Sequence, residues 1–253
     1  MQESTSAERF VEELETHRSP EEREKYRRYF KTGEGEYGEG DMFIGVRMGQ
    51  VFAVAKVFMD MPPKEIEKLL ESPVHEVRAG ALSIMDKQGR AKKTPESRRK
   101  ELFDLYLRRT DRIDNWDLVD LGAPYVVGRY LFDKPRDVLY ELARSRSIWE
   151  RRTAIVATSY FIRQGDVADT FEIAELLLDD DHDLIHKATG GWLREAGKYD
   201  RQRLLSFLDE HAATMPRTML RYAIEHLDKE QRDHYLNMKK AAKAGQNQEG
   251  DRS

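Results

Sequence analysis

A short pattern recurs along the chain with a spacing typical of stacked helical pairs. In each copy a basic residue comes just before a cluster of small residues, and the copies begin at Arg78, Arg152, Lys187 and Arg221. The separations are 74, 35 and 34 residues, and 74 is twice 37. Such periods are typical of helical repeat proteins, in which each helical pair buries its apolar face against the next pair. We therefore predict an all-α superhelix, a solenoid of helical repeats.

Hydrophobic periodicity supports this prediction along the chain. From Pro62 onward, helical patterns alternate with short breaks at Pro, Gly or Asp. The helices predicted there span 63–71, 73–87, 96–108, 114–131, 135–144, 147–163, 167–178, 183–197, 200–210, 216–227 and 229–242. Upstream, we predict two helices within 6–31 separated at Ser19-Pro20, a glycine-rich loop over 33–40, and a helix that ends near Phe58.

The composition narrows the class of protein. Charged residues make up 36% of the 253 residues and Gly and Pro are few, which favours a helix-rich chain. The absence of cysteine excludes disulfides, thiolate catalysis and cysteine-ligated metals. No apolar run reaches membrane-spanning length and the acidic N-terminus lacks a signal-peptide pattern, so we expect a cytoplasmic protein without a membrane partner. We expect one repeat domain over 1–243, a disordered tail over 244–253, and a monomer.

The net charge of −4 is unevenly distributed. Residues 1–41 carry 7 Lys and Arg against 12 Asp and Glu, whereas the remainder carries 36 against 35. A surface that binds phosphate must therefore be a local stripe. Equivalent positions line up in a solenoid, so the four basic repeat residues would form such a stripe. The alternative is that each basic side chain pairs with acids of the next unit.

Two further clusters add positive charge. Seven basic residues lie between 87 and 100, and four lie between 144 and 152. Charge runs of this kind are most often solvated faces, and a nucleic-acid surface is the alternative.

The copy of the repeat expected near position 115 is replaced by Asn115-Trp116-Asp117-Leu118-Val119-Asp120. On a helix, Trp116 and Asp120 are four residues apart and share one face. Asp120 lies in an apolar run, where a solvated residue is unexpected and an unpaired buried charge would be costly. Pro124 cannot bond the carbonyl of Asp120, so we expect the helix to break or restart there. Asp120 is thus a candidate catalytic carboxylate; the alternative is a core helix in which it pairs with an arginine.

Other polar residues have structural explanations. Asp114 lies where a helix N-cap is expected, and Asp117 follows in the first turn near the positive end of the helix dipole. His182 and His186 are four residues apart beside three aspartates, which suits a metal, but these acids are better explained as caps of a helix that begins near Asp183. The chain contains no phosphate-binding glycine loop, nucleophile elbow or dinucleotide fingerprint. We expect neither a metal nor a cofactor.

Together these features resemble the DNA alkylation repair glycosylases built from HEAT-like repeats, the AlkD family. The similarity spans about Tyr26 to about Tyr222. Its most specific piece is the stretch over 116–120, which is similar to the family's Trp-Asp-x-Val-Asp motif. Segments 148–155 and 187–195 match two more parts of the family, and 28–31 and 43–46 match weaker ones.

The resemblance implies roles for four residues. Asp120 takes the place of the catalytic carboxylate, and Trp116 that of an indole facing the damaged base. Arg152 would contact the DNA backbone near the lesion, and Tyr29 would supply an aromatic contact.

One position departs from the family pattern. Where the family usually has a tryptophan facing the lesion, this chain has Gly191, and the indole follows at Trp192. A shift of one residue turns a helical side chain by about 100°, which puts the substrate range in doubt. We still count Trp192 among the expected DNA-binding residues, together with the repeat residues Arg78, Lys187 and Arg221.

The resemblance implies a DNA glycosylase that excises cationic N3- or N7-alkylated purines from duplex DNA. Such a base already leaves readily, so the enzyme needs no general acid. A carboxylate near the sugar would stabilise the oxocarbenium-like transition state and position a water, and Trp116 would add a cation–π contact. The alternatives are a non-catalytic protein that binds DNA structures and a protein-binding repeat scaffold.

Overall fold

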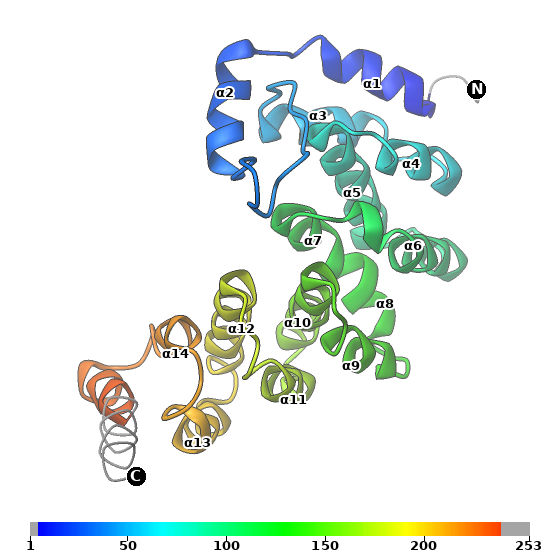
Figure 1. Cartoon of the computed structure of the whole chain (residues 1–253). Coiled ribbons are helices and arrows are strands. Elements are labelled where there is room, and N and C mark those ends of the chain that lie inside the picture. The colour runs from blue at the N-terminus through cyan, green and yellow to red at the C-terminus, as the bar shows by residue number, and fades with distance from the viewer. Residues whose placement is uncertain (1–4, 239–253) are drawn as a thin grey trace. The chain divides into compact units, whose positions relative to one another are not determined.

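The computed structural model describes residues 5–238, and its regular elements in that range are helices (Figure 1). The only extended pairing there is an isolated bridge between Met42 and Val74. The all-α prediction is therefore confirmed. The tail predicted to be disordered, 244–253, lies outside the described residues. Within the described range, no helix has both the length and the apolar character that crossing a membrane requires.

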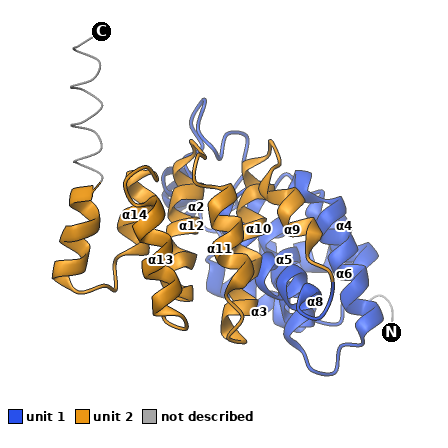
Figure 2. Cartoon of the chain, turned by 90° about the horizontal axis from the view of Figure 1, so that it is seen from below, with its two compact units in different colours: residues 1–134 blue, residues 135–253 orange. Residues whose placement is uncertain are grey.

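The chain forms two compact units, Met1–Lys134 and Pro135–Ser253 (Figure 2). The helices of unit 1 are α1 (Ala7–Glu15), α2 (Pro20–Tyr29), α3 (Met48–Val57), α4 (Pro63–Leu70), α5 (His75–Arg90), α6 (Glu96–Arg108), η2 (Thr110–Arg112), α7 (Trp116–Gly122), η3 (Ala123–Gly128) and α8 (Arg129–Leu131). Helix α5 packs between α3 and α7, and α4 packs on both α5 and α6. Unit 1 is thus a two-layer stack in which α3, α5 and α7 form one layer.

Unit 2 repeats this arrangement. Its helices are α9 (Asp137–Ala143), α10 (Ile148–Arg163), α11 (Ala168–Leu176), α12 (Asp183–Ala196), α13 (Arg201–His211) and α14 (Arg217–Ala223), and a further helix covers 229–238. Helix α12 packs between α10 and α14, while α9 packs on α10 and α11. The step from α10 to α12 to α14 is the predicted repeat, because Arg152, Lys187 and Arg221 lie on these three helices.

The small residues of the repeat pattern let neighbouring helices approach closely. A Cβ atom on Gly190 would lie only 2.3 Å from the carbonyl oxygen of Met219 in α14. A Cβ on Gly80 would lie 2.3 Å from Cζ of Phe10 in α1. Since such distances are far below van der Waals contact, these two positions require glycine.

The α-helix that begins at Trp116 ends at Gly122, so the expected irregularity at Pro124 is present, but it is a π-turn and not a break in the helical run. Residues 116–131 are helical throughout, but the backbone widens into the π-turn η3 at Ala123–Gly128. Within this turn the N–H of Arg129 bonds the carbonyl of Pro124, five residues earlier. A π-turn tolerates the missing N–H and the ring of proline that would interrupt a regular α-helix.

A buried carboxylate holds the segment between α2 and α3 against α5. Glu76 is fully buried and accepts hydrogen bonds from the backbone N–H groups of Ile44, Gly45 and Val46 at 2.7–3.2 Å. Gly45 has a φ of +81°, and a Cβ there would lie 1.9 Å from the carbonyl oxygen of Ser19. Only glycine fits this position, so the segment is fixed against the start of α2.

Candidate active site

Helix α7 carries the two residues predicted to be catalytic. Its N-cap is Asn115, whose side-chain oxygen accepts a hydrogen bond from the N–H of Trp116 at 2.8 Å, so the predicted cap at Asp114 is wrong. Asp120 lies one turn after Trp116 and is exposed, whereas Leu118 and Val119 are fully buried. Our expectation that a solvated residue would not fit here is therefore corrected: Asp120 faces away from the apolar side of α7, where a substrate can reach it.

Trp116 belongs to a cluster of aromatic rings contributed by α2 and α7. Its indole stacks on Phe30 with ring centroids 5.8 Å apart and an interplanar angle of 22°. Tyr29 meets the same indole edge-on at 5.9 Å and is 63% exposed. The structure thus brings together Trp116 and Tyr29, which we had singled out separately, and leaves the phenol ring open to a ligand.

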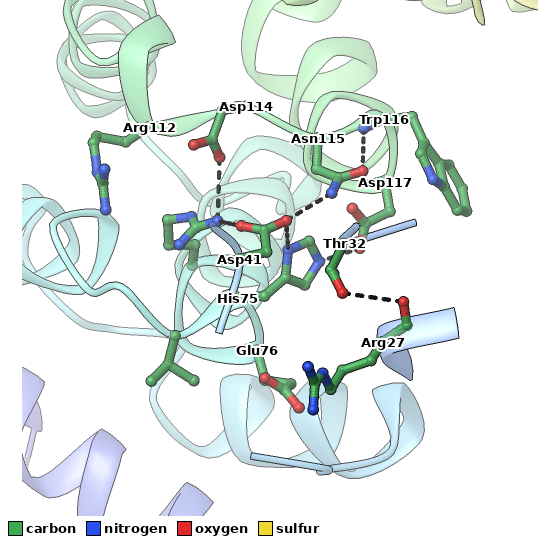
Figure 3. Close-up of polar contacts among 12 residues, drawn as sticks. Arg27, Thr32, Asp41, His75, Glu76, Arg112, Asp114, Asn115, Trp116 and Asp117 are labelled. Atoms are coloured by element: carbon green, nitrogen blue, oxygen red, sulfur yellow. Dashed lines mark hydrogen bonds and ion pairs between the residues drawn. The ribbon is translucent and has the colours of Figure 1, made fainter. Parts of the chain in front are cut away.

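Beneath this cluster lies a histidine that we had not identified from the sequence. His75 is fully buried, with Nε2 2.8 Å from Asp117 Oδ2 and Nδ1 3.3 Å from Asp41 Oδ2 (Figure 3). Its ring packs against Phe30 and Phe43 with centroids 4.7 and 4.9 Å away. Burial alone would lower the pKa of His75, but the charges and hydrogen bonds of the two carboxylates raise it to about 9. His75 is therefore an imidazolium at neutral pH.

Asp41 links this histidine to α7. Besides the contact with His75, its carboxylate accepts a hydrogen bond from Asn115 Nδ2 at 2.8 Å (Figure 3). Burial raises the pKa of Asp41, but hydrogen bonds from His75 and Asn115 and the charge of Arg78 outweigh burial and lower it. The N-cap of α7 is thus tied to the end of the glycine-rich loop.

Arg78 is also part of this buried network, which corrects its predicted role as a DNA contact. Only 2% of Arg78 is exposed, and its guanidinium pairs with Asp41 and, at 3.2 Å, with Asp114. It also donates to the carbonyl of Ser72 at 3.0 Å. These partners enclose the guanidinium, so it cannot reach a phosphate. Arg78 therefore follows the alternative given for the repeat residues, in which a basic side chain pairs with acids of the next unit.

The polar residues that build this network gave one signal in the sequence. His75 and Glu76 are adjacent polar residues in the first turn of a helix whose residues are nearly all buried, and their sequence context did not identify them as site residues. Their partners Asp41 and Asp117 are 34 and 42 residues away from His75. A single sequence does not reveal such distant pairs.

The remaining basic repeat residues lie in unit 2. Arg152 is 8% exposed and donates from Nη1 to the carbonyl of Leu184 at 2.8 Å. The side chain of Lys187 is 44% exposed and pairs with Asp183, one turn earlier, at 2.7 Å. Arg221 is exposed on α14. A common face that joins these residues to Asp120 of unit 1 stays a prediction.

The departure from the family pattern has a clear structural counterpart. A Cβ atom on Gly191 would have no neighbouring atom within 4 Å, so this position opens into space. Trp192 is partly buried and packs against the hydrophobic core of unit 2. The indole at 192 is thus used for packing, while the position that precedes it carries no side chain.

The histidines beside the three aspartates cap a helix. His182 is the N-cap of α12 and its Nδ1 accepts from the N–H of Leu184 at 3.2 Å, so a histidine takes the place that we predicted for an acid. His186 bonds the carbonyl of Asp180. Across residues 5–238, no three His, Asp or Glu side chains are grouped in a way that would hold a metal ion.

Comparisons with known proteins agree with this architecture. The model of the DNA alkylation repair enzyme family matches residues 10–227. A solved structure, "Predicted DNA alkylation repair enzyme from Enterococcus faecalis", is similar with a TM-score of 0.68 and 17% sequence identity, covering 84% of this chain and 98% of that one. At this identity the likeness shows a shared fold. No curated protein matches the chain.

Proposed function

Because the chain belongs to the family of DNA alkylation repair enzymes, we propose that it is a DNA glycosylase that excises cationic N3- or N7-alkylated purines from duplex DNA. The observation that carries this proposal is the exposed carboxylate of Asp120, one helical turn from Trp116, whose indole meets the exposed ring of Tyr29. Two aromatic rings and one negative charge suit a positively charged base and a sugar that becomes cationic as the bond breaks.

The reaction requires stabilisation of the positive charge on the sugar and a water positioned to attack it. As the glycosidic bond of an alkylated purine breaks, electrons leave with the base, which becomes neutral, and positive charge develops on the sugar. Asp120 would stabilise that charge and orient the water that attacks the sugar. The imidazolium of His75 is fully buried and bonded to Asp117, so it is not available to protonate a leaving group.

The decisive experiment compares release of free base from methylated duplex DNA by the wild type and by Asp120→Asn. The variant keeps the size of the side chain and removes its charge, so we expect excision to slow by roughly 10²–10³, with unchanged folding and DNA affinity. Asp111→Asn is the matched control, because Asp111 is an exposed aspartate of the same unit on η2. Excision by Asp120→Asn at the wild-type rate would refute the catalytic role.

A second candidate is a repeat protein that binds DNA structures without excision. The open space at Gly191, where the resembled family has an indole, favours this alternative. Duplex binding by a wild type that releases no base would establish it. The cytoplasmic location and the monomeric state stay predictions.

A further inference from the structure

We propose that Lys87 and Arg90, in the last turn of α5, form a ridge that binds phosphates of the DNA backbone beside Asp120. This inference rests on the proposed function only for the identity of the ligand, duplex DNA. Nothing in the family match or in the resemblance assigns a role to these two residues, which belong to the basic cluster between 87 and 100.

The burial of α5 is the first observation. All of its 16 residues are buried except Lys87 and Arg90. Since α3 and α7 pack on either side of α5, these two side chains are what the middle helix of this layer presents to solvent. Basic residues in a last turn also stabilise the helix dipole. That role does not explain why Lys87 and Arg90 are the two residues of α5 that are not buried.

Each cation lies over an aromatic ring of a neighbouring helix. Lys87 Nζ is 5.7 Å from the centre of the Phe52 ring in α3, and Arg90 Cζ is 3.8 Å from that of Tyr125 in η3. A cation over an aromatic face is held there by attraction to the ring. One face of each ring is taken up by a cation, while Phe52 stays 36% exposed. The ridge therefore offers positive charge to phosphates.

The charge of the ridge is only partly neutralised. Asp86 accepts from Arg90 Nε at 2.8 and 2.7 Å, and both contacts use the nitrogen nearest the chain. Within residues 5–238, the hydrogen bonds of Arg90 to Asp86 both use Nε, so Nη1 and Nη2 are available to a phosphate. Lys56, one turn after Phe52 on α3, is exposed and adds a further positive charge. The exposed Asp60, which lines one cavity with Gln88, adds a second carboxylate. Three cations against two carboxylates leave a net positive surface, which attracts a polyanion.

Tyr125 places the ridge close to the candidate catalytic residue. It follows Asp120 by five residues on one continuous helical run, which corresponds to about 8 Å along the helix axis. The contact is rigid, because a Cβ on Gly89 would lie only 2.7 Å from the carbonyl oxygen of Tyr125.

The test measures how affinity for an undamaged duplex depends on salt, for Lys87→Gln, Arg90→Gln and the double variant of the full chain. Each lost phosphate contact lowers the slope of log K against log salt by about 0.9, so we expect a loss of about 1.8 for the double variant. Lys64→Gln, at an exposed lysine of α4, should keep the wild-type slope. Arg90→Lys retains the charge and should also keep it, which separates charge from packing. Thermal melts establish that each variant is folded.

A folded double variant with the wild-type slope would overturn the proposal that the ridge binds phosphates. A wild type that binds no duplex would also overturn it, as would a loss of affinity confined to single-stranded DNA. Base release separates this inference from the proposed function. If the wild type releases no base but the slope falls as expected, the ridge stands and the glycosylase proposal fails. If the wild type releases base and the slope is unchanged, the ridge alone fails.

Discussion

His75 Nε2 and Asp117 Oδ2 lie 2.8 Å apart, and this buried ion pair joins the first turn of α5 to the first turn of the helix that carries Asp120. The same imidazolium contacts Asp41, at the end of the loop that follows α2. The imidazole also packs against Phe30, which stacks on Trp116, so we infer that His75 positions the aromatic side of the candidate site.

The charge of His75 predicts how stability changes with pH. Its pKa rises from 6.5 to about 9 on folding, so its stabilising effect is complete below pH 6.5 and is lost as the pH rises through about 9. The rise corresponds to about 3 kcal/mol. We expect the free energy of unfolding of His75→Gln to fall below that of the wild type at pH 6, with the gap narrowing by pH 9.5.

Urea unfolding at several pH values measures this gap. His226→Gln, at an exposed histidine of unit 2, is the control and should follow the wild type at every pH. A gap between His75→Gln and the wild type that stays constant from pH 6 to 9.5 would show that the imidazole is held there for its shape and not for its charge.

Two adjacent glycines in α12 should respond in opposite ways to alanine. Gly191→Ala adds a methyl group in open space and removes a flexible helical position, so it should raise the free energy of unfolding by about 0.5–1 kcal/mol. Gly190→Ala would press its Cβ to within 2.3 Å of the Met219 carbonyl and should lower the free energy of unfolding by about 1–3 kcal/mol. Chemical denaturation of both variants checks this; equal effects would mean that α12 and α14 separate easily.

Arg152 and Lys187 were predicted as equivalent DNA contacts, but they differ in burial: Arg152 is 8% exposed, whereas the side chain of Lys187 is 44% exposed. Arg152→Ala removes the partner of the Leu184 carbonyl and should lower stability by about 1–3 kcal/mol, so any loss of DNA binding would be partly structural. The ion pair of Lys187 with Asp183 is largely exposed to solvent, so Lys187→Gln should leave the melting temperature nearly unchanged. It should weaken binding to damaged and undamaged duplex equally, as titrations of both would show. Unchanged binding would make Lys187 a surface residue without a role in DNA recognition.

Much of the fold followed from the sequence, because repeat spacing and helical periodicity are local properties of the chain. Helix α6 covers the residues predicted for it, 96–108. The kind of irregularity at Pro124 could not be predicted, because proline alone does not distinguish a break from a π-turn. Packing of α7 and η3 against α5 and α6 favours a continuous helix, and a π-turn accommodates the proline within it.

The candidate site was only half visible in the sequence. Trp116 and Asp120 share a helix, so their spacing revealed them. Arg78 was misinterpreted because a recurring basic residue looks the same whether it faces solvent or an acid of the next repeat. Its partner Asp41, which also accepts from Asn115 74 residues away, comes from the loop after α2. Such a contact exists only once the loop folds onto α5.

The charge of the lesion should decide what this protein excises. Asp120 is the only site residue to which we assign a chemical step, and it supplies negative charge without a proton. The buried His75 is bonded to Asp117 and offers none. N3-methyladenine and N7-methylguanine carry a positive charge and leave as neutral bases, so their release needs only stabilisation of the sugar cation. Uracil would leave as an anion and would need an acid or a strong donor. We therefore expect release of both methylated purines from duplex DNA and no release of uracil, measured by chromatography of the free bases. Release of uracil at a rate that Asp120→Asn does not reduce would reject this mechanism.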